Sequence, residues 1–339
     1  MGHRRRLTAR SLRDALGGLA RTVAPAGATL EVSLPAQETG RTLQAALLVD
    51  GEMRARAVSA IDEAVPVFGA FLDGVQDSRV VAYVGSVPIV QGRMGAVIRA
   101  RADRRLATWG DGPHLDEALY LPLALVPREV ADALETTERP IVDTTDASPG
   151  DGTAPEDCHP QQWLRRALHL VQRGREALER ALAEAWCRQG GAVPLYVDGG
   201  LPSSGVVLGS TCAVGVIKSH HTLYATGSAL ATVATLGIGE RSSPFVVETR
   251  WREPVASWYL RLRRPEGHDP FWGLVRIEVP LALLLGEGTS PDASADRVSR
   301  WVAAEASPLA LPDARWDTMA YGIRDCEVFL RATLGRAMA

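Results

Sequence analysis

Apolar residues recur every three or four positions in several stretches of the chain, the spacing that gathers them on one face of a helix. The longest stretches are Ala9–Val23, Arg41–Ala64, Gln161–Arg188 and Thr318–Leu334. The first two predict a separate helical region over residues 1–64. The third predicts a long helix whose glutamates lie on the faces that its leucines leave free. We therefore expect helices at both ends of the chain and one long helix near its middle.

Short apolar runs with β-branched and aromatic residues predict strands between these helices. Three of them predict a three-stranded meander, namely Val67–Gly74, Arg79–Val84 and Pro88–Arg101. After the long helix, the residues PLYVD predict a short buried strand that ends in Asp198, and a second apolar run leads to Lys218. We expect a hairpin here, flanked by one carboxylate and one ammonium group.

Two later segments, Ala256–Arg264 and Phe271–Val279, alternate apolar and polar residues and predict half-buried strands with arginine on the polar side. Residues 143–160 combine turn formers with acids, which predicts an exposed loop. We expect one domain over residues 65–339, interrupted by this loop. The predicted fold class is α/β, a mixed sheet flanked by helices with helical additions at both ends.

The composition narrows the class of protein. The chain has 339 residues, 46% of them apolar, and a net charge of −3, so it can bury a substantial core and is not globally basic. No apolar run approaches the roughly 20 residues that span a bilayer. The four cysteines are scattered without a C-x-x-C pair. We expect a soluble, cytoplasmic protein whose cysteines are reduced and mostly buried.

Two aspartates suggest a reactive site. Asp73 and Asp198 each follow an apolar strand and precede glycine. If the two strands are parallel neighbours, both carboxylates emerge at one edge of the sheet, where their repulsion favours a bound divalent cation. Carboxylate oxygens suit Mn²⁺ or Mg²⁺. A third ligand is expected from the long helix, with Glu179 as first choice and Glu176 as second.

Lys218 is the single lysine among 37 basic residues, and it follows a strand as Asp198 does. An ammonium group at this place suits a scissile phosphate. Arginine is concentrated between Arg79 and Arg105, which suggests a track for backbone phosphates. For that track we predict three arginines from the strands, Arg99, Arg261 and Arg276.

Other catalytic motifs fail on spacing. GSTCAVGVIKS at 209–219 resembles a phosphate-binding loop, but it has the pattern of a strand and its glycine-to-lysine spacing is wrong. His220 and His221 have no partner at metal-ligand spacing, and a G-x-S-x-G nucleophile motif is absent. Zinc chemistry and serine-based hydrolysis are therefore poorly supported.

The order of several short motifs resembles the NurA family of DNA-end-processing nucleases. These motifs are FLDG at 71–74, YVDGGL at 196–201, VGVIKS at 214–219, SWYLRL at 257–262 and GLVRIEV at 273–279. The resemblance implies an RNase H-like fold and a Mn²⁺-dependent nuclease (5′–3′ exonuclease and single-strand endonuclease) that forms a homodimer and works with a hexameric HerA-type ATPase. It also implies that Asp73, Asp198 and a helix glutamate bind the metal.

The chain departs from the family pattern near its C-terminus, where many members have a tyrosine and an Ala-His pair. Here no histidine follows His268, and Asp317 or Asp325 is the candidate replacement. This departure leaves open a catalytically incomplete DNA-guiding subunit of a motor complex. Two further rival functions are an ATP-dependent sugar or acetate kinase, and a structural protein whose Asp-Gly pairs only turn the chain.

Overall fold

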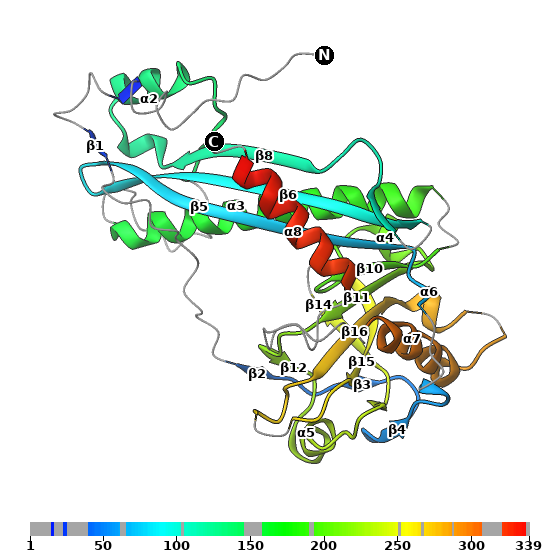
Figure 1. The fold of residues 1–339 in the computed structure, drawn as a ribbon. Helices are drawn as coiled ribbons and strands as arrows, with labels where there is room; N and C mark the ends of the chain where they lie inside the picture. Colours follow the sequence, from blue (N-terminus) through cyan, green and yellow to red (C-terminus); the bar gives the residue numbers. More distant parts are fainter. Residues whose placement is uncertain are drawn as a thin grey trace.

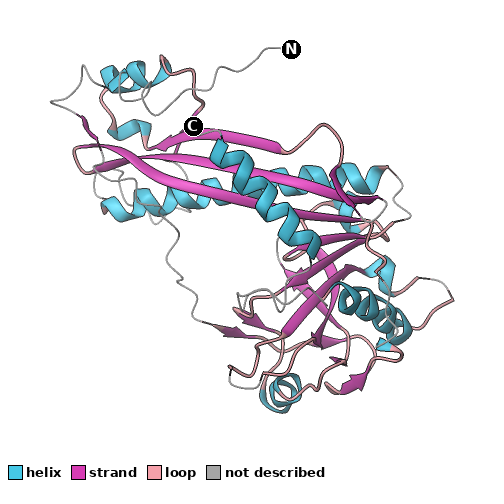
Figure 2. Ribbon diagram, viewed as in Figure 1, coloured by secondary structure: helices cyan, strands magenta, loops and turns pink. Residues whose placement is uncertain are grey.

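The computed structural model describes residues 15–16, 23–25, 40–61, 66–102, 105–145, 158–189, 193–249, 252–265, 268–286, 288–306 and 321–336. These residues form a mixed α/β fold in which one large, twisted sheet is flanked by helices (Figures 1 and 2). In sheet order the strands are β3 (Ala46–Leu47), β14 (Phe245–Thr249), β15 (Arg252–Arg261), β16 (Leu274–Pro280), β11 (Ala213–Ile217), β10 (Leu195–Asp198), β5 (Ala70–Val84), β6 (Val87–Ala102), β8 (His114–Leu121) and β9 (Ile141–Asp143).

Short strands extend the margins of this sheet. They are β1 (Val23–Pro25) beside β5, β7 (Arg105–Thr108) beside β6, and β4 (Ala55–Ala57) beside β13 (Glu240–Ser242), which also pairs with β15. Strands β2 (Arg41–Thr42) and β12 (Thr222–Leu223) form a separate parallel pair. The predicted helix over Arg41–Ala64 is therefore wrong for residues 40–61, because their backbone groups pair with strands far along the chain. Most of the predicted Ala9–Val23 helix lies outside the described residues.

The long helix and the C-terminal helix cover opposite faces of the sheet. Alternate residues of a strand face opposite sides. On β5, Ala70 and Leu72 belong to the core under α3 (Pro160–Arg188), whereas Phe71 and Val75 belong to the core under α8 (Tyr321–Arg336). Figure 1 shows α8 crossing β5 and β6 in front while α3 runs behind them. Both predicted helices are confirmed, and both run past Asp73.

Smaller helices connect or cover the remaining strands. They are η2 (Leu123–Leu125), α2 (Arg128–Glu135), α4 (Gly205–Leu208), α5 (Gly227–Ala234), α6 (Leu281–Leu284) and α7 (Pro291–Glu305). Within the described residues, no helix is long and apolar enough to cross a bilayer.

The meander differs from its prediction. The segments predicted as two strands, Val67–Gly74 and Arg79–Val84, belong to the single strand β5, which pairs with β6 in antiparallel register. Asp73 therefore lies within a continuous strand, opposite Val97, and Asp73-Gly74 is not a turn. The third strand of the observed meander is β8, which pairs with the other edge of β6.

The predicted hairpin between Asp198 and Lys218 is also wrong. Strand β11 runs parallel to β10, with Leu195 opposite Ala213, and α4 lies in the connection between them. Two adjacent parallel strands bring their carboxyl ends to the same edge of the sheet. Asp198 and Lys218 are therefore neighbours at one edge, where a hairpin would have placed them on consecutive antiparallel strands.

Candidate active site

The two aspartates become neighbours through a parallel strand pair. Strands β5 and β10 align Phe71 with Tyr196 and Leu72 with Val197, and the next residue on each strand is Asp73 and Asp198. Strand β10 ends here, because Gly199 adopts a positive φ of 98° that favours glycine and turns the chain away. Strand β5 continues. The sequence prediction that both strands are parallel neighbours is confirmed.

Lys218 completes this edge. Its Nζ lies 2.6 Å from Oδ1 of Asp198 in an ion pair whose side chains are both about four-fifths buried. That carboxylate oxygen is buried and has no partner with hydrogen-bond geometry. The ammonium therefore neutralises Asp198 without using its oxygen as a directional acceptor, and the oxygen remains suited to a cation ligand.

Glu179 reaches the same strand from α3. Its Oε1 lies over Gly74, where a β-carbon would come within 2.3 Å of it, so glycine at this position makes room for the carboxylate. Arg175, one helical turn earlier, donates to Glu179 through Nη1 and to Oε1 of Gln76 at 3.1 Å through Nε. Glu176 is half exposed and accepts a hydrogen bond from Gln172 at 2.9 Å. Of the two predicted glutamates, Glu179 is the one that lies against β5.

Burial and like charge weaken the ionisation of two of these acids. Desolvation, followed by the charge of Asp198, raises the pKa of Asp73 to about 8, although Lys218 and the Gly74 N–H act in the opposite direction. Desolvation also raises the pKa of Glu179 to about 7, against the opposing effect of Arg175. Without a bound cation, Asp73 is therefore largely protonated at neutral pH.

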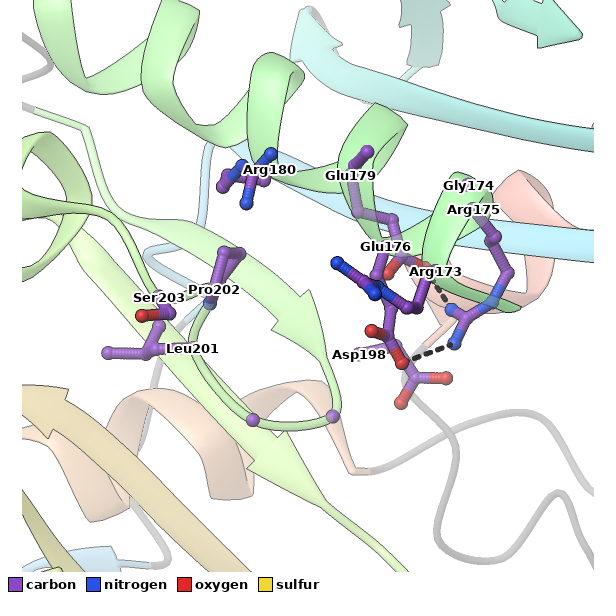
Figure 3. Close-up of a pocket in the computed structure, with 13 residues that line it drawn as sticks. Arg173, Gly174, Arg175, Glu176, Glu179, Arg180, Asp198, Leu201, Pro202 and Ser203 are labelled. Atoms are coloured by element: carbon purple, nitrogen blue, oxygen red, sulfur yellow. Dashed lines mark hydrogen bonds and ion pairs between the residues drawn. The ribbon is translucent and has the colours of Figure 1, made fainter. Parts of the chain in front are cut away.

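Two pockets meet at Asp198. The larger, about 590 Å³, lies between α3 and the loop after β10, and includes Glu179, Arg173, Arg180 and Ser203. Figure 3 shows Arg175, Glu176 and Glu179 reaching from α3 toward Asp198. The smaller pocket, about 310 Å³, is lined by Asp73, Gly74, Val75, Gln76, Arg175, Asp198, Glu327 and Arg331. Asp198 and Arg175 line both pockets, so this edge is open to a ligand from either face of β5.

The carboxylates fit a divalent cation in part. Asp73 and Asp198 are adjacent hard oxygen donors; Asp198 has an orphaned buried oxygen, and Asp73 is kept protonated by burial and by the charge of its neighbour. Within the described residues, however, no three histidine, cysteine or acidic side chains converge closely enough to form a ready metal cluster. Because Gly74 and Asp73 point to opposite faces of β5, Glu179 lies across the strand from Asp73 and is held there by Arg175.

The three predicted phosphate-binding arginines are structural. Arg261 is fully buried, and its guanidinium donates to the carbonyl oxygens of Leu236, Trp272, Ala234 and Pro270. This prediction is wrong, because strand β15 is covered on both faces. Arg276 donates to Glu278 at 2.7 Å and is about nine-tenths buried. Arg99 donates to Asp325, Thr108 and the carbonyl of Leu106. We do not retain these arginines as DNA ligands.

The two C-terminal acids do not complete the site. Asp325 lies on α8, where its Oδ2 accepts from Nε of Arg99 at 2.5 Å, and it lines neither pocket. Asp317 lies outside the described residues. The acid that α8 contributes to the smaller pocket is Glu327, whose carboxylate accepts from Arg331 at 3.0 Å and from Arg324 at 3.2 Å. Burial raises the pKa of Glu327, but these hydrogen bonds outweigh burial and lower it.

Arg175 and Glu327 are the site residues that sequence reasoning missed. Each forms a charged pair with a residue four positions along its helix, a spacing that is visible in the sequence. Such pairs are common on solvated helices, and nothing local indicates that these two face a strand. Their role depends on where α3 and α8 pack.

Comparisons with known proteins add little to this geometry. No protein-family model matches the chain, and no curated protein matches it. One solved structure similar to it is the NurA nuclease from Sulfolobus solfataricus, with 12% identity, a TM-score of 0.38, and coverage of 82% of this chain and 89% of that one.

Proposed function

We propose that this protein is a metal-dependent deoxyribonuclease. The observation that carries the proposal is the parallel pairing that brings Asp73 and Asp198 together beside Lys218, at a sheet edge open to two pockets. Phosphodiester hydrolysis needs negatively charged ligands for a cation and a positive group for the phosphate. This edge supplies both kinds of group within contact distance of one another.

The topology supports an RNase H-like core. The order β8-β6-β5-β10-β11 combines an antiparallel meander with two parallel strands. The acids that we assign to catalysis stand on the central neighbours of that order. Together with the ordered motifs in the sequence, this arrangement favours a nuclease of the NurA type, with 5′–3′ exonuclease and single-strand endonuclease activity.

In this mechanism Asp73 and Asp198 hold Mn²⁺ or Mg²⁺, and Glu179 supplies a further oxygen. The bound cation activates a water molecule and stabilises the leaving 3′ oxygen. Lys218 loses part of its ion pair with Asp198 as the cation binds, and its ammonium group then contacts the scissile phosphate. Asp73 releases its proton on binding the cation, because a protonated carboxyl is a poor ligand.

Arg173 and Arg180 replace the strand arginines as phosphate ligands in this proposal. Both are exposed on α3, and both line the larger pocket with Asp198. Guanidinium groups on either side of a catalytic edge attract a polyanion and position its backbone. A DNA strand in this pocket would pass Glu179 and Asp198 on its way to Lys218.

The test is direct. The full-length chain is incubated with end-labelled single-stranded and double-stranded DNA plus Mn²⁺, with and without chelator, beside Asp198→Asn. We expect cleavage that requires both the metal and Asp198. Full activity of Asp198→Asn, or cleavage in excess chelator, contradicts the proposal. Adding a hexameric HerA-type ATPase, and measuring mass in solution, tests the proposed partner and the proposed homodimer separately.

A second candidate is a catalytically incomplete DNA-guiding subunit of a motor complex. It is favoured by the engagement of Glu179 with Arg175 and by the lack of a preformed three-acid cluster in the described residues. Calorimetric titration separates the two functions. A nuclease binds Mn²⁺ and loses that binding in Asp73→Asn, whereas the guiding subunit binds DNA but no Mn²⁺ at this edge.

A further inference from the structure

Two cysteines that are distant in the sequence lie in contact away from the proposed active site. The Sγ atoms of Cys187 and Cys212 are 3.6 Å apart. Cys187 is in the last turn of α3, and Cys212 directly precedes β11. The expectation of four scattered thiols is therefore wrong for these two, because the packing of α3 against the start of β11 places them side by side.

The surroundings of this pair favour reaction over simple burial. Cys187 is only half buried, whereas Cys212 exposes 5% of its surface. The hydroxyl of Ser210 lies 3.6 Å from the sulfur of Cys187 and 3.8 Å from that of Cys212. The contact with Cys187, assisted by Ser210, lowers the pKa of Cys212 to about 6, which makes its thiolate available at neutral pH. A nucleophilic sulfur thus has a second sulfur within reach.

We infer that Cys187 and Cys212 form a reversible disulfide when the protein meets a peroxide. The Cys212 thiolate attacks hydrogen peroxide, the O–O bond breaks, and sulfenic acid and hydroxide form. The Cys187 thiol then condenses with the sulfenic acid, the S–S bond forms, and water leaves. Overall, two thiols lose two electrons and two protons, and one peroxide becomes two waters.

The backbone can accommodate this bond. A disulfide requires the two sulfurs to approach to about 2.05 Å. Cys187 stands one residue before the end of α3, and the segment from Gly209 to Cys212 is a loop, so both ends lie next to irregular backbone. The new bond ties the C-terminal turn of α3 to the start of β11. These are the elements that carry Glu179 and lead to Lys218.

The test uses the reduced full-length chain. It is treated with hydrogen peroxide, its remaining thiols are alkylated, and its peptides are identified by mass spectrometry. We expect two of the four thiols to disappear, a Cys187–Cys212 cross-linked peptide to appear, and dithiothreitol to restore both thiols. The oxidised chain should also unfold at a higher temperature, and dithiothreitol should reverse that shift.

Matched variants decide the assignment. Cys187→Ser, at the half-buried position, should keep its fold by circular dichroism and should lose the cross-link. Cys158→Ser, a cysteine of another part of the fold, should behave as the wild type. Four intact thiols after peroxide, a cross-link between other cysteines, or loss of two thiols in Cys187→Ser each overturn the inference. None of these measurements depends on nuclease activity.

Discussion

Asp73 and Asp198 lie side by side because Leu72 and Val197, the residues before them, are register partners in the parallel pair β5–β10. The two strands behave differently beyond this point. Strand β10 turns away at Gly199, whereas β5 continues to Val84. A carboxylate within a strand thus meets a carboxylate at a strand end, and the space beyond the ended strand is open to ligands. The following predictions depend on this relationship.

The first prediction concerns stability against pH. The pKa of Asp73 is raised from 3.8 to about 8 in the folded protein, so the folded state retains a proton that the unfolded state releases. Stability from this proton is complete below about pH 4 and is lost as the pH rises toward 8. In chelator, Asp73→Asn should flatten the fall of the melting temperature over this range and should stabilise the protein at pH 8 by on the order of several kcal/mol. An unchanged pH profile contradicts the assignment.

Metal affinity should depend on pH in the opposite sense. Because Asp73 and Glu179 have pKa values of about 8 and about 7, cation binding displaces protons at neutral pH. Calorimetric titration with Mn²⁺ should give weaker binding at pH 6.5 than at pH 8.5. The measured heat should also vary with the ionisation enthalpy of the buffer, which reports proton release. Asp73→Asn should bind weakly at both pH values.

Lys218 should affect both the rate and its pH dependence. Its ammonium is the nearest charge that favours ionised Asp73. Lys218→Gln should therefore move the rise of cleavage rate to higher pH. It should also lower the rate at the plateau by about 10²-fold to 10³-fold, the size found when a group that stabilises transition-state charge is removed. A lower rate with an unmoved pH profile would leave Lys218 as a phosphate ligand only.

Gly74→Ala tests the position of Glu179. The added carbon would lie 2.3 Å from Oε1 of Glu179, so the carboxylate has to move. We expect a loss of stability of about 1–3 kcal/mol and a loss of cleavage similar to that of Glu179→Gln. Gly51→Ala is the control, because nothing lies within 4 Å of its added carbon. Equal cleavage by Gly74→Ala and the wild type would remove Glu179 from the site.

Arginine variants separate DNA binding from folding. Arg173→Gln combined with Arg180→Gln should leave the melting temperature unchanged and should weaken binding of a single-stranded oligonucleotide. The slope of log affinity against log salt should fall by about 0.7 for each phosphate that the variant no longer neutralises. Arg261→Gln should instead destabilise the fold by about 3 kcal/mol or more, since it leaves several buried carbonyl groups unpaired. Arg128→Gln, on exposed α2, should change neither property.

The sequence alone determined the elements whose pattern is local. The leucine spacing of Gln161–Arg188 predicts α3, because one face of a helix is apolar wherever it packs. The PLYVD run predicts β10, and the lone lysine after an apolar run indicates the edge that Lys218 shares with Asp198. The choice of Asp73 and Asp198 as a pair was also available from the sequence, on the condition that their strands are parallel.

Only the tertiary structure decided that condition and its consequences. Strand direction and register depend on hydrogen bonds between distant segments, so Asp73-Gly74 has the sequence of a turn but lies within β5. The same long-range pairing draws residues 41–57 into strands where their periodicity predicts a helix. Burial of both faces of β15 makes Arg261 structural, and the packing of α3 and α8 brings Arg175 and Glu327 to the site. Side-chain alternation shows which residues share a face, but what covers that face is settled by the whole chain.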